Sequence, residues 1–135
     1  MKDALEIIRA REQAEDVKRL EGYHLLLDAE GPAPTQHAVH EYMLTMAAVL
    51  GMTVLSPALV IETKQGGMTG MLIIAESHIS VHFQPPHQYA IDVFSCKRFD
   101  SGPAVAFTVQ HFRLTHEQVR LINRGEVPVA VNTSH

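Results

Sequence analysis

Three apolar, strand-like runs follow one another between residues 68 and 97, and they constrain the fold more than any other feature. They are MTGMLIIAE (68–76), HISVHF (78–83) and YAIDVFSCK (89–97). Only short breaks separate them, PPHQ at 85–88 being the longest, and Gly66 and Gly67 form a tight turn ahead of the first. The pattern predicts consecutive, turn-linked strands of a mainly antiparallel sheet.

Helices are predicted on both sides of this region. Apolar residues recur at helical spacing over 3–20, with charges between them, and Gly22 closes that helix. Thr35 is suited to cap a second helix over 36–50, and residues 104–112 favour a third. The stripe that we expect the second helix to bury comprises Val39, Met43, Met46, Ala47 and Leu50.

Further strands are expected at 23–29, 52–62 and 117–123. Pro57 interrupts the second of these, as is typical of an edge strand or a bulge. Helices interspersed with short strands predict an α+β fold, with helices on one face of a mainly antiparallel sheet. We expect residues 1–21 to be an N-terminal helical extension and 22–135 to be a single domain, with a frayed tail from Gly125.

Composition and charge exclude several classes of protein. The chain has 135 residues, of which 46% are hydrophobic and 19% charged, as in one folded domain. A net charge of −4 with dispersed basic residues argues against nucleic-acid binding. The N-terminus mixes charges of both signs, unlike a signal peptide, and the most apolar stretch, 42–55, is too short to span a bilayer. We expect a cytoplasmic protein without a nucleic-acid or membrane partner.

Polar residues interrupt the apolar run between Glu76 and His82, and three conventional chemistries fit them poorly. On a strand, His78 and His82 would lie about 13 Å apart, too far to share one metal ion. Ser77 lies in no GxSxG elbow, which argues against a serine hydrolase. Cys96 is the only cysteine, so it forms no intrachain disulfide; it is either a small buried hydrophobe or a nucleophile paired with a histidine.

Self-processing is a further reading of the same residues. A serine hydroxyl that attacks the preceding carbonyl converts its own peptide bond into an ester, and β-elimination then leaves a pyruvoyl group. This chemistry needs a strained peptide, a neighbouring base and donors for the oxyanion. Glu76, Ser77 and His78, with His82 nearby, match those needs. Because Ser77 and His82 are an odd number apart, a regular strand would point them to opposite faces, so we predict an irregularity at 76–78.

The segments MTGMLIIAESHISVHF (68–83) and YAIDVFSC (89–96) resemble the prokaryotic S-adenosylmethionine decarboxylases, and GYHLLLDA (22–29) matches the first strand of that family. The combination of ESHxxxH with a cysteine at this distance is the specific part of the match, which weakens beyond Asp100. The resemblance implies a pyruvoyl-dependent decarboxylase of polyamine biosynthesis. It also implies a two-layer α/β sandwich that pairs through its sheets into a homodimer, with active sites near the interface.

The resemblance assigns a role to each residue that matches the family motif. Ser77 would become the pyruvoyl group after cleavage between Glu76 and Ser77, and would form a Schiff base with the substrate amine. His82 would assist processing, supported by Thr69 in place of the usual serine. Cys96 would reprotonate the product carbon. The covalent pyruvoyl group would be the cofactor, with no metal.

The chain departs from the family pattern in substrate recognition. The WPE-type stretch of the family reads Gln-Pro-Pro at 84–86, and residues 60–64 contain no aromatic to stack on adenine. Losing one stacking contact and one carboxylate contact would weaken adenosine binding by roughly a hundredfold or more. We therefore expect L-ornithine or L-arginine as the substrate, with Glu62 as its carboxylate partner and Asp28 and Glu30 behind it. S-Adenosylmethionine decarboxylase proper and a non-processing homologue that acts as a binding subunit remain alternatives.

Overall fold

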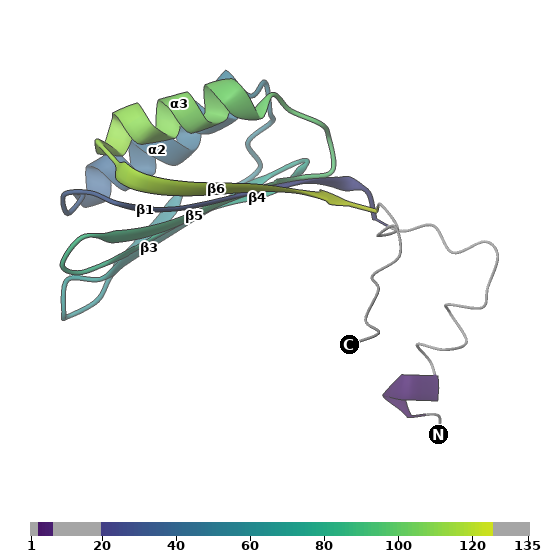
Figure 1. Ribbon diagram of the computed structural model, residues 1–135, viewed down its shortest axis with the longest axis horizontal. Helices are drawn as coiled ribbons and strands as arrows, with labels where there is room; N and C mark the ends of the chain where they lie inside the picture. Colours follow the sequence, from purple (N-terminus) through teal and green to yellow (C-terminus); the bar gives the residue numbers. More distant parts are fainter. Residues whose placement is uncertain (1–2, 7–19, 126–135) are drawn as a thin grey trace.

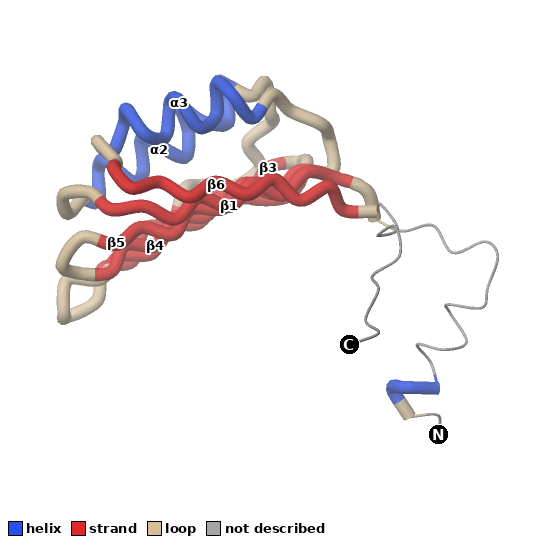
Figure 2. The backbone as a smooth tube through the Cα atoms, viewed as in Figure 1, coloured by secondary structure: helices blue, strands red, loops and turns tan. Residues whose placement is uncertain are grey.

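Six strands form one sheet, and two helices cover one of its faces (Figures 1 and 2). The computed structural model describes residues 3–6 and 20–125. In chain order the elements are β1 (Gly22–Glu30), α2 (Gln36–Val49), β2 (Leu59–Glu62), β3 (Met68–Ile74), β4 (Ser77–Gln84), β5 (Gln88–Ser95), α3 (Ser101–Phe112) and β6 (Thr115–Arg124). Every neighbouring pair in the order β2-β3-β4-β5-β1-β6 is antiparallel, which confirms the predicted α+β sandwich. In this part of the chain no helix is long and apolar enough to cross a membrane.

Most of the predicted elements are present, with differences at their ends. The predicted 68–76 strand stops at Ile74, because Ala75 and Glu76 form a tight turn that pairs Ile74 with Ser77. The predicted 52–62 strand is a strand only from Leu59, with an isolated bridge at Val54 on the other side of Pro57. Of the predicted N-terminal helix, only residues 4–6 are described as helical; the rest of it and the tail beyond residue 125 lie outside the described residues.

The core lies between the helices and the alternate strand residues that face them. It includes Leu25, Leu27, Leu72, Ile79, Val81, Ile91 and Val93 from the sheet. The stripe predicted on α2 is buried as expected, except for Leu50, which follows the helix as its half-buried C-cap. Tyr42 joins the stripe, its hydroxyl 2.7 Å from that of Thr108 on α3. Thr35 caps α2 as predicted, accepting a hydrogen bond from the Ala38 amide at 3.0 Å.

Gly70 allows α2 to lie directly on β3. A Cβ atom at this position would lie 2.7 Å from Val39 Cγ1 and 2.9 Å from Met43 Cε, closer than side-chain contacts allow. Its neighbours in the strand, Thr69 and Met71, are exposed because successive strand residues point to opposite faces. The glycine next to Thr69 is therefore explained by helix packing.

The opposite face of the sheet is covered by no described helix, and we call it the open face. By strand register its side chains include Thr69, Met71 and Ile73 of β3, His78, Ser80, His82 and Gln84 of β4, Ala90, Asp92 and Phe94 of β5, and His24, Leu26 and Asp28 of β1. The face is partly apolar, since Ile61, Ile73 and Ile122 are each exposed by 46–55% of their surface. Thr69, His78, His82 and Asp28, four of the polar candidates from the sequence, lie on this face.

Candidate active site

The turn between β3 and β4 holds the bond between Glu76 and Ser77. Because Ile74 pairs with Ser77, only two residues reverse the chain. Ser77 has a φ angle of 154°, a backbone conformation that residues with a side chain rarely adopt and that costs roughly 1–3 kcal/mol. The irregularity predicted at 76–78 is therefore present.

Two groups contact the atoms that would react in this turn. The Ser77 hydroxyl lies 3.0 Å from Nδ1 of His78, a potential base. The backbone amide of Cys96 donates a hydrogen bond of 2.9 Å to the carbonyl oxygen of Glu76, which would carry negative charge if the hydroxyl attacked. The sequence motif contained His78, but only strand register could reveal the Cys96 amide.

Cys96 lies immediately after β5, next to the Ser77 turn. Ser95 pairs with Ser77 across the β4–β5 ladder, so the residue that follows it lies at the same end of the sheet. The thiol is free and Cys96 is exposed, which excludes the reading of Cys96 as a small buried hydrophobe. An exposed thiol beside Ser77 is available to exchange a proton with a bound molecule.

Thr69 and His82 form a separate group at the other end of β4. They pair directly across β3 and β4, and Thr69 Oγ1 lies 2.9 Å from Nδ1 of His82. His82 follows Ser77 by five residues, which corresponds to about 16 Å at the rise of a strand. The expectation that His82 lies near Ser77 is therefore wrong within one chain, because the strand between them is extended.

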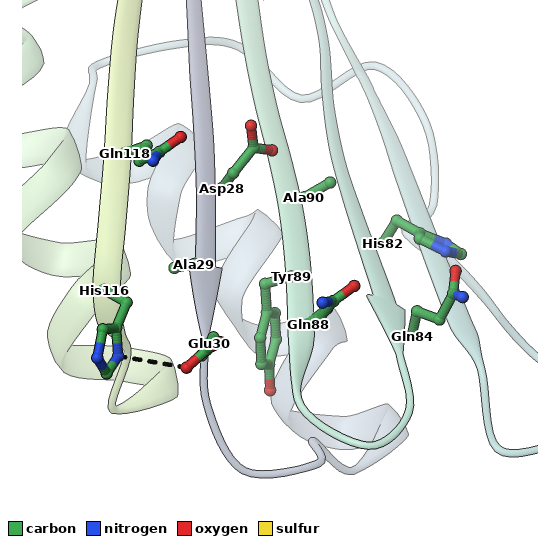
Figure 3. Close-up of a pocket in the computed structure, with 10 residues that line it drawn as sticks. All are labelled: Asp28, Ala29, Glu30, His82, Gln84, Gln88, Tyr89, Ala90, His116 and Gln118. Carbon is green, nitrogen blue, oxygen red and sulfur yellow. Dashed lines mark ion pairs between the residues drawn. The ribbon is translucent and has the colours of Figure 1, made fainter.

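A cavity of about 540 Å³ opens on the sheet beside His82 (Figure 3). Asp28, Ala90 and His82 lie opposite one another on β1, β5 and β4. The small side chain of Ala90 leaves space between the carboxylate and the imidazole, as Figure 3 shows. Glu30 and the amides of Gln84, Gln88 and Gln118 line the same cavity. The lining thus combines two carboxylates with three side-chain amides and the imidazoles of His82 and His116, and the carboxylates suit a cationic group.

The two carboxylates have only exposed partners. Glu30 lies 3.2 Å from His116 Nδ1, the pair drawn as a dashed line in Figure 3. Asp28 lies 3.5 Å from the Arg120 guanidinium, and both side chains are more than half exposed. Exposed ion pairs contribute about 0–1 kcal/mol, so a bound cation can displace such a partner at little cost.

Tyr89 forms a fixed part of the cavity lining. Burial raises the pKa of its hydroxyl to about 12, although the positive charge of Arg113 acts to lower it. The hydroxyl is therefore protonated at neutral pH, and it donates a 2.6 Å hydrogen bond to the carbonyl of Pro32. This bond ties the end of β5 to the loop after β1.

Glu62, the carboxylate that we expected to bind substrate, lies away from this cavity. It pairs with Met68, whose side chain is buried beneath the helices, so Glu62 does not belong to the open face. Its carboxylate accepts a 3.1 Å hydrogen bond from Gln36 at the start of α2. The sequence could not show on which face Glu62 lies, because its pattern predicted the strand but not the register of that strand. Asp28 and Glu30, which we expected behind Glu62, are the carboxylates that line the cavity.

Comparisons with known proteins decide the family. The family model for S-adenosylmethionine decarboxylase matches residues 23–125. The chain belongs to the pyruvoyl-dependent S-adenosylmethionine decarboxylase family. It is 36% identical over 112 residues to an S-adenosylmethionine decarboxylase proenzyme of Clostridium botulinum (strain Loch Maree / Type A3), covering 78% of this chain and 96% of the relative. A second such proenzyme, from Pyrococcus furiosus, is 34% identical over 110 residues, covering 77% of this chain and 78% of the relative.

A solved structure supports the same fold. The crystal structure of the adenosylmethionine decarboxylase from Aquifex aeolicus matches with a TM-score of 0.68 at 24% identity, covering 86% of this chain and 99% of that chain. The S-adenosylmethionine decarboxylase family uses a pyruvoyl group, and this chain is a pyruvoyl-dependent decarboxylase by family. In the described residues no group of three His, Cys, Asp or Glu side chains is placed to hold a metal ion.

Proposed function

We propose that this chain cleaves itself between Glu76 and Ser77 and that two copies share each active site, which decarboxylates L-ornithine or L-arginine. The main support for the proposal is the Ser77 turn. There a strained serine follows the Glu76 carbonyl, which accepts a hydrogen bond from the Cys96 amide. The remaining groups are assigned from their positions on the open face.

Self-cleavage begins when the Ser77 hydroxyl loses its proton and its oxygen bonds to the Glu76 carbonyl carbon. The Cys96 amide stabilises the resulting oxyanion, and His78 is the base within reach of the hydroxyl. The C–N bond then breaks to give an ester. Loss of the Ser77 α-proton breaks the Cβ–O bond and frees Glu76 as a carboxylate. Addition of water and release of ammonia leave a pyruvoyl group at residue 77.

A second copy explains why the Thr69–His82 pair lies at the other end of the sheet. If two open faces pack about a two-fold axis perpendicular to the strands, the Ser77 end of each copy faces the His82 end of its partner. The exposed apolar side chains of Met71, Ile73 and Ile122 would be buried by such packing. Each site would then combine Ser77 and Cys96 of one copy with Thr69 and His82 of the other, and His82 would support processing there.

The pyruvoyl group supplies a carbonyl that reacts with the substrate amine and accepts electrons when CO₂ leaves. The side chains of the protein supply the remaining functions. We assign Cys96, which follows the Ser95 that pairs with Ser77 and carries a free thiol, as the acid that protonates the product carbon. The cavity lined by Asp28 and Glu30 of the partner copy would receive the far end of the substrate.

A basic amino acid is favoured by the side chains at that far end. The end of β4 and the loop that follows carry neither an indole nor a carboxylate to hold adenosine, since residues 84–86 read Gln-Pro-Pro. Asp28 and Glu30 supply negative charge for an ammonium or guanidinium group. S-Adenosylmethionine, the substrate in the relatives' names, is the alternative.

The substrate is tested by measuring CO₂ release from L-ornithine, L-arginine and S-adenosylmethionine with the self-cleaved protein. We expect release from a basic amino acid, and we expect Asp28→Asn to raise its KM about 10- to 100-fold through loss of a charged hydrogen bond. Glu62→Gln is the matched control and should leave KM unchanged, because Glu62 lies off the open face. Release from S-adenosylmethionine alone would contradict the proposed substrate.

A further inference from the structure

A second cavity, of about 120 Å³, lies at the Ser77 end of the sheet and contains Cys96. Two arginines, Arg98 and Arg124, line it, together with the single carboxylate of Glu21. A space of this size accommodates a small anionic group and is too small for a nucleoside. The cavity therefore places positive charge next to the thiol that we assign as the proton donor.

Aromatic rings hold both guanidinium groups. The Arg124 guanidinium carbon lies 4.5 Å from the centre of the Phe94 ring, and that of Arg98 lies 5.3 Å from the centre of the Tyr23 ring. Phe94 is itself buried on the open face, flanked by the rings of His24 and His78. A guanidinium fixed on a ring loses little freedom when it binds a carboxylate through two parallel hydrogen bonds.

Strand register ties Arg124 to the reacting turn. Arg124 pairs with Gly22, and a Cβ atom on Gly22 would lie 2.3 Å from the Ser95 carbonyl oxygen and 2.9 Å from Cys96 Cα. Only glycine permits this close approach, which brings the start of β1 against Cys96, with the end of β6 on the other side of β1. On the other side, the Phe94 ring contacts His78, which hydrogen-bonds to Ser77.

We infer that Arg124 binds the α-carboxylate of the amino-acid substrate, while Arg98, which stacks on Tyr23 on the helix-covered side of the sheet, adds positive charge to the same cavity. This inference rests on the proposed function, because it needs the substrate amine to react at residue 77. The amine and the carboxylate are attached to the same carbon, so the carboxylate must lie within a few ångströms of residue 77. The second cavity is lined by Cys96 and lies at the same end of the sheet. The Arg124 guanidinium and the carboxylates in the first cavity of the partner copy complement the two ends of a basic amino acid.

Reductive capture measures how much the carboxylate contributes to binding, apart from the rest of the ligand. The cleaved protein is titrated with L-arginine or agmatine, and with L-ornithine or putrescine, in the presence of cyanoborohydride. The reductant links the ligand nitrogen to the carbonyl carbon of residue 77, with loss of water. Mass spectrometry then measures the adduct on the cleavage product that begins at residue 77. Adducts that keep the substrate carboxylate and adducts that have lost it as CO₂ are added together. Each amine lacks only the carboxylate of its amino acid.

We expect Arg124→Gln to raise the half-saturating concentration of the amino acids about 10- to 100-fold and to leave that of the amines unchanged. Arg124→Lys keeps the positive charge but cannot form two parallel hydrogen bonds, so its half-saturating concentration for the amino acids should lie between those of the wild type and Arg124→Gln. Arg120→Gln removes the same charge from the same strand and should leave the ratio of amino-acid to amine concentrations unchanged.

The outcomes distinguish this inference from the proposed function. An equal change for amino acids and amines would overturn the carboxylate assignment while leaving self-cleavage and capture intact. Failure of Arg124→Gln and Arg124→Lys to cleave themselves would also overturn it, because Arg124 would then act in processing. A wild-type chain of full, uncleaved mass would overturn the proposed function itself.

Discussion

Coexpression with Ser77→Ala chains is expected to restore self-cleavage of His82→Ala chains, which cleave slowly on their own. Ser77→Ala removes the attacking hydroxyl, so it should not cleave at all. His82→Ala removes a group that acts on a partner, and we expect cleavage to slow by about 10²- to 10⁴-fold, the usual contribution of a positioned acid or base. In a mixed dimer, the His82→Ala chain keeps its own Ser77 and receives His82 from the partner.

The readout is the fraction of His82→Ala chains that are cleaved, measured by mass spectrometry on dimers that contain one chain of each kind. The matched control pairs Ser77→Ala/His82→Ala with His82→Ala, a combination that supplies no histidine to the intact serine. We expect no rescue there. Rapid cleavage of His82→Ala by itself, or mixed dimers that stay uncleaved, would contradict the division of the site between two copies.

Cys96→Ala is expected to separate processing from catalysis. The variant keeps the backbone amide that hydrogen-bonds to the Glu76 carbonyl, so the chain should still cleave itself. It loses the thiol that we assign as the proton donor, so decarboxylation of the cleaved protein should slow by about 10²- to 10⁴-fold. Intact mass measures the first step and CO₂ release the second.

The control for this experiment is Cys96→Ser, which keeps a small polar group but replaces the thiol with a much weaker acid. We expect it to cleave and to remain slow in decarboxylation. Either of two results would contradict the assignment. One is a Cys96→Ala chain that decarboxylates at the wild-type rate, and the other is a chain that stays uncleaved, because the thiol would then be needed for processing.

The sequence predicted the layers of the fold because the pattern of apolar residues is a local signal. The runs at 68–97 are short, apolar and bounded by turn residues, as strands are, and the stripe on α2 recurs at helical spacing, so both kinds of element could be predicted directly. Element ends were less accurate: the first of these strands was predicted to continue to Glu76, whereas Ala75 and Glu76 form the turn. Short turns lack a periodic signal.

The site was harder to predict because it depends on register and on distance along extended strands. The irregularity at Ser77 followed from parity alone and is present. Sequence proximity, in contrast, wrongly suggested that Ser77 and His82 are neighbours, although the strand extends between them. The sequence also could not show which of Glu62 and Asp28 would bind the substrate, because a one-residue difference in register decides which face a strand residue occupies.

Self-cleavage between Glu76 and Ser77 is tested by the mass of the freshly purified, denatured wild-type protein. We expect two chains, one of 76 residues ending at Glu76 and one of 135 − 76 = 59 residues. The second chain should be lighter by one ammonia than a chain that begins with serine. A single chain of 135 residues would contradict self-cleavage and would favour a binding subunit instead.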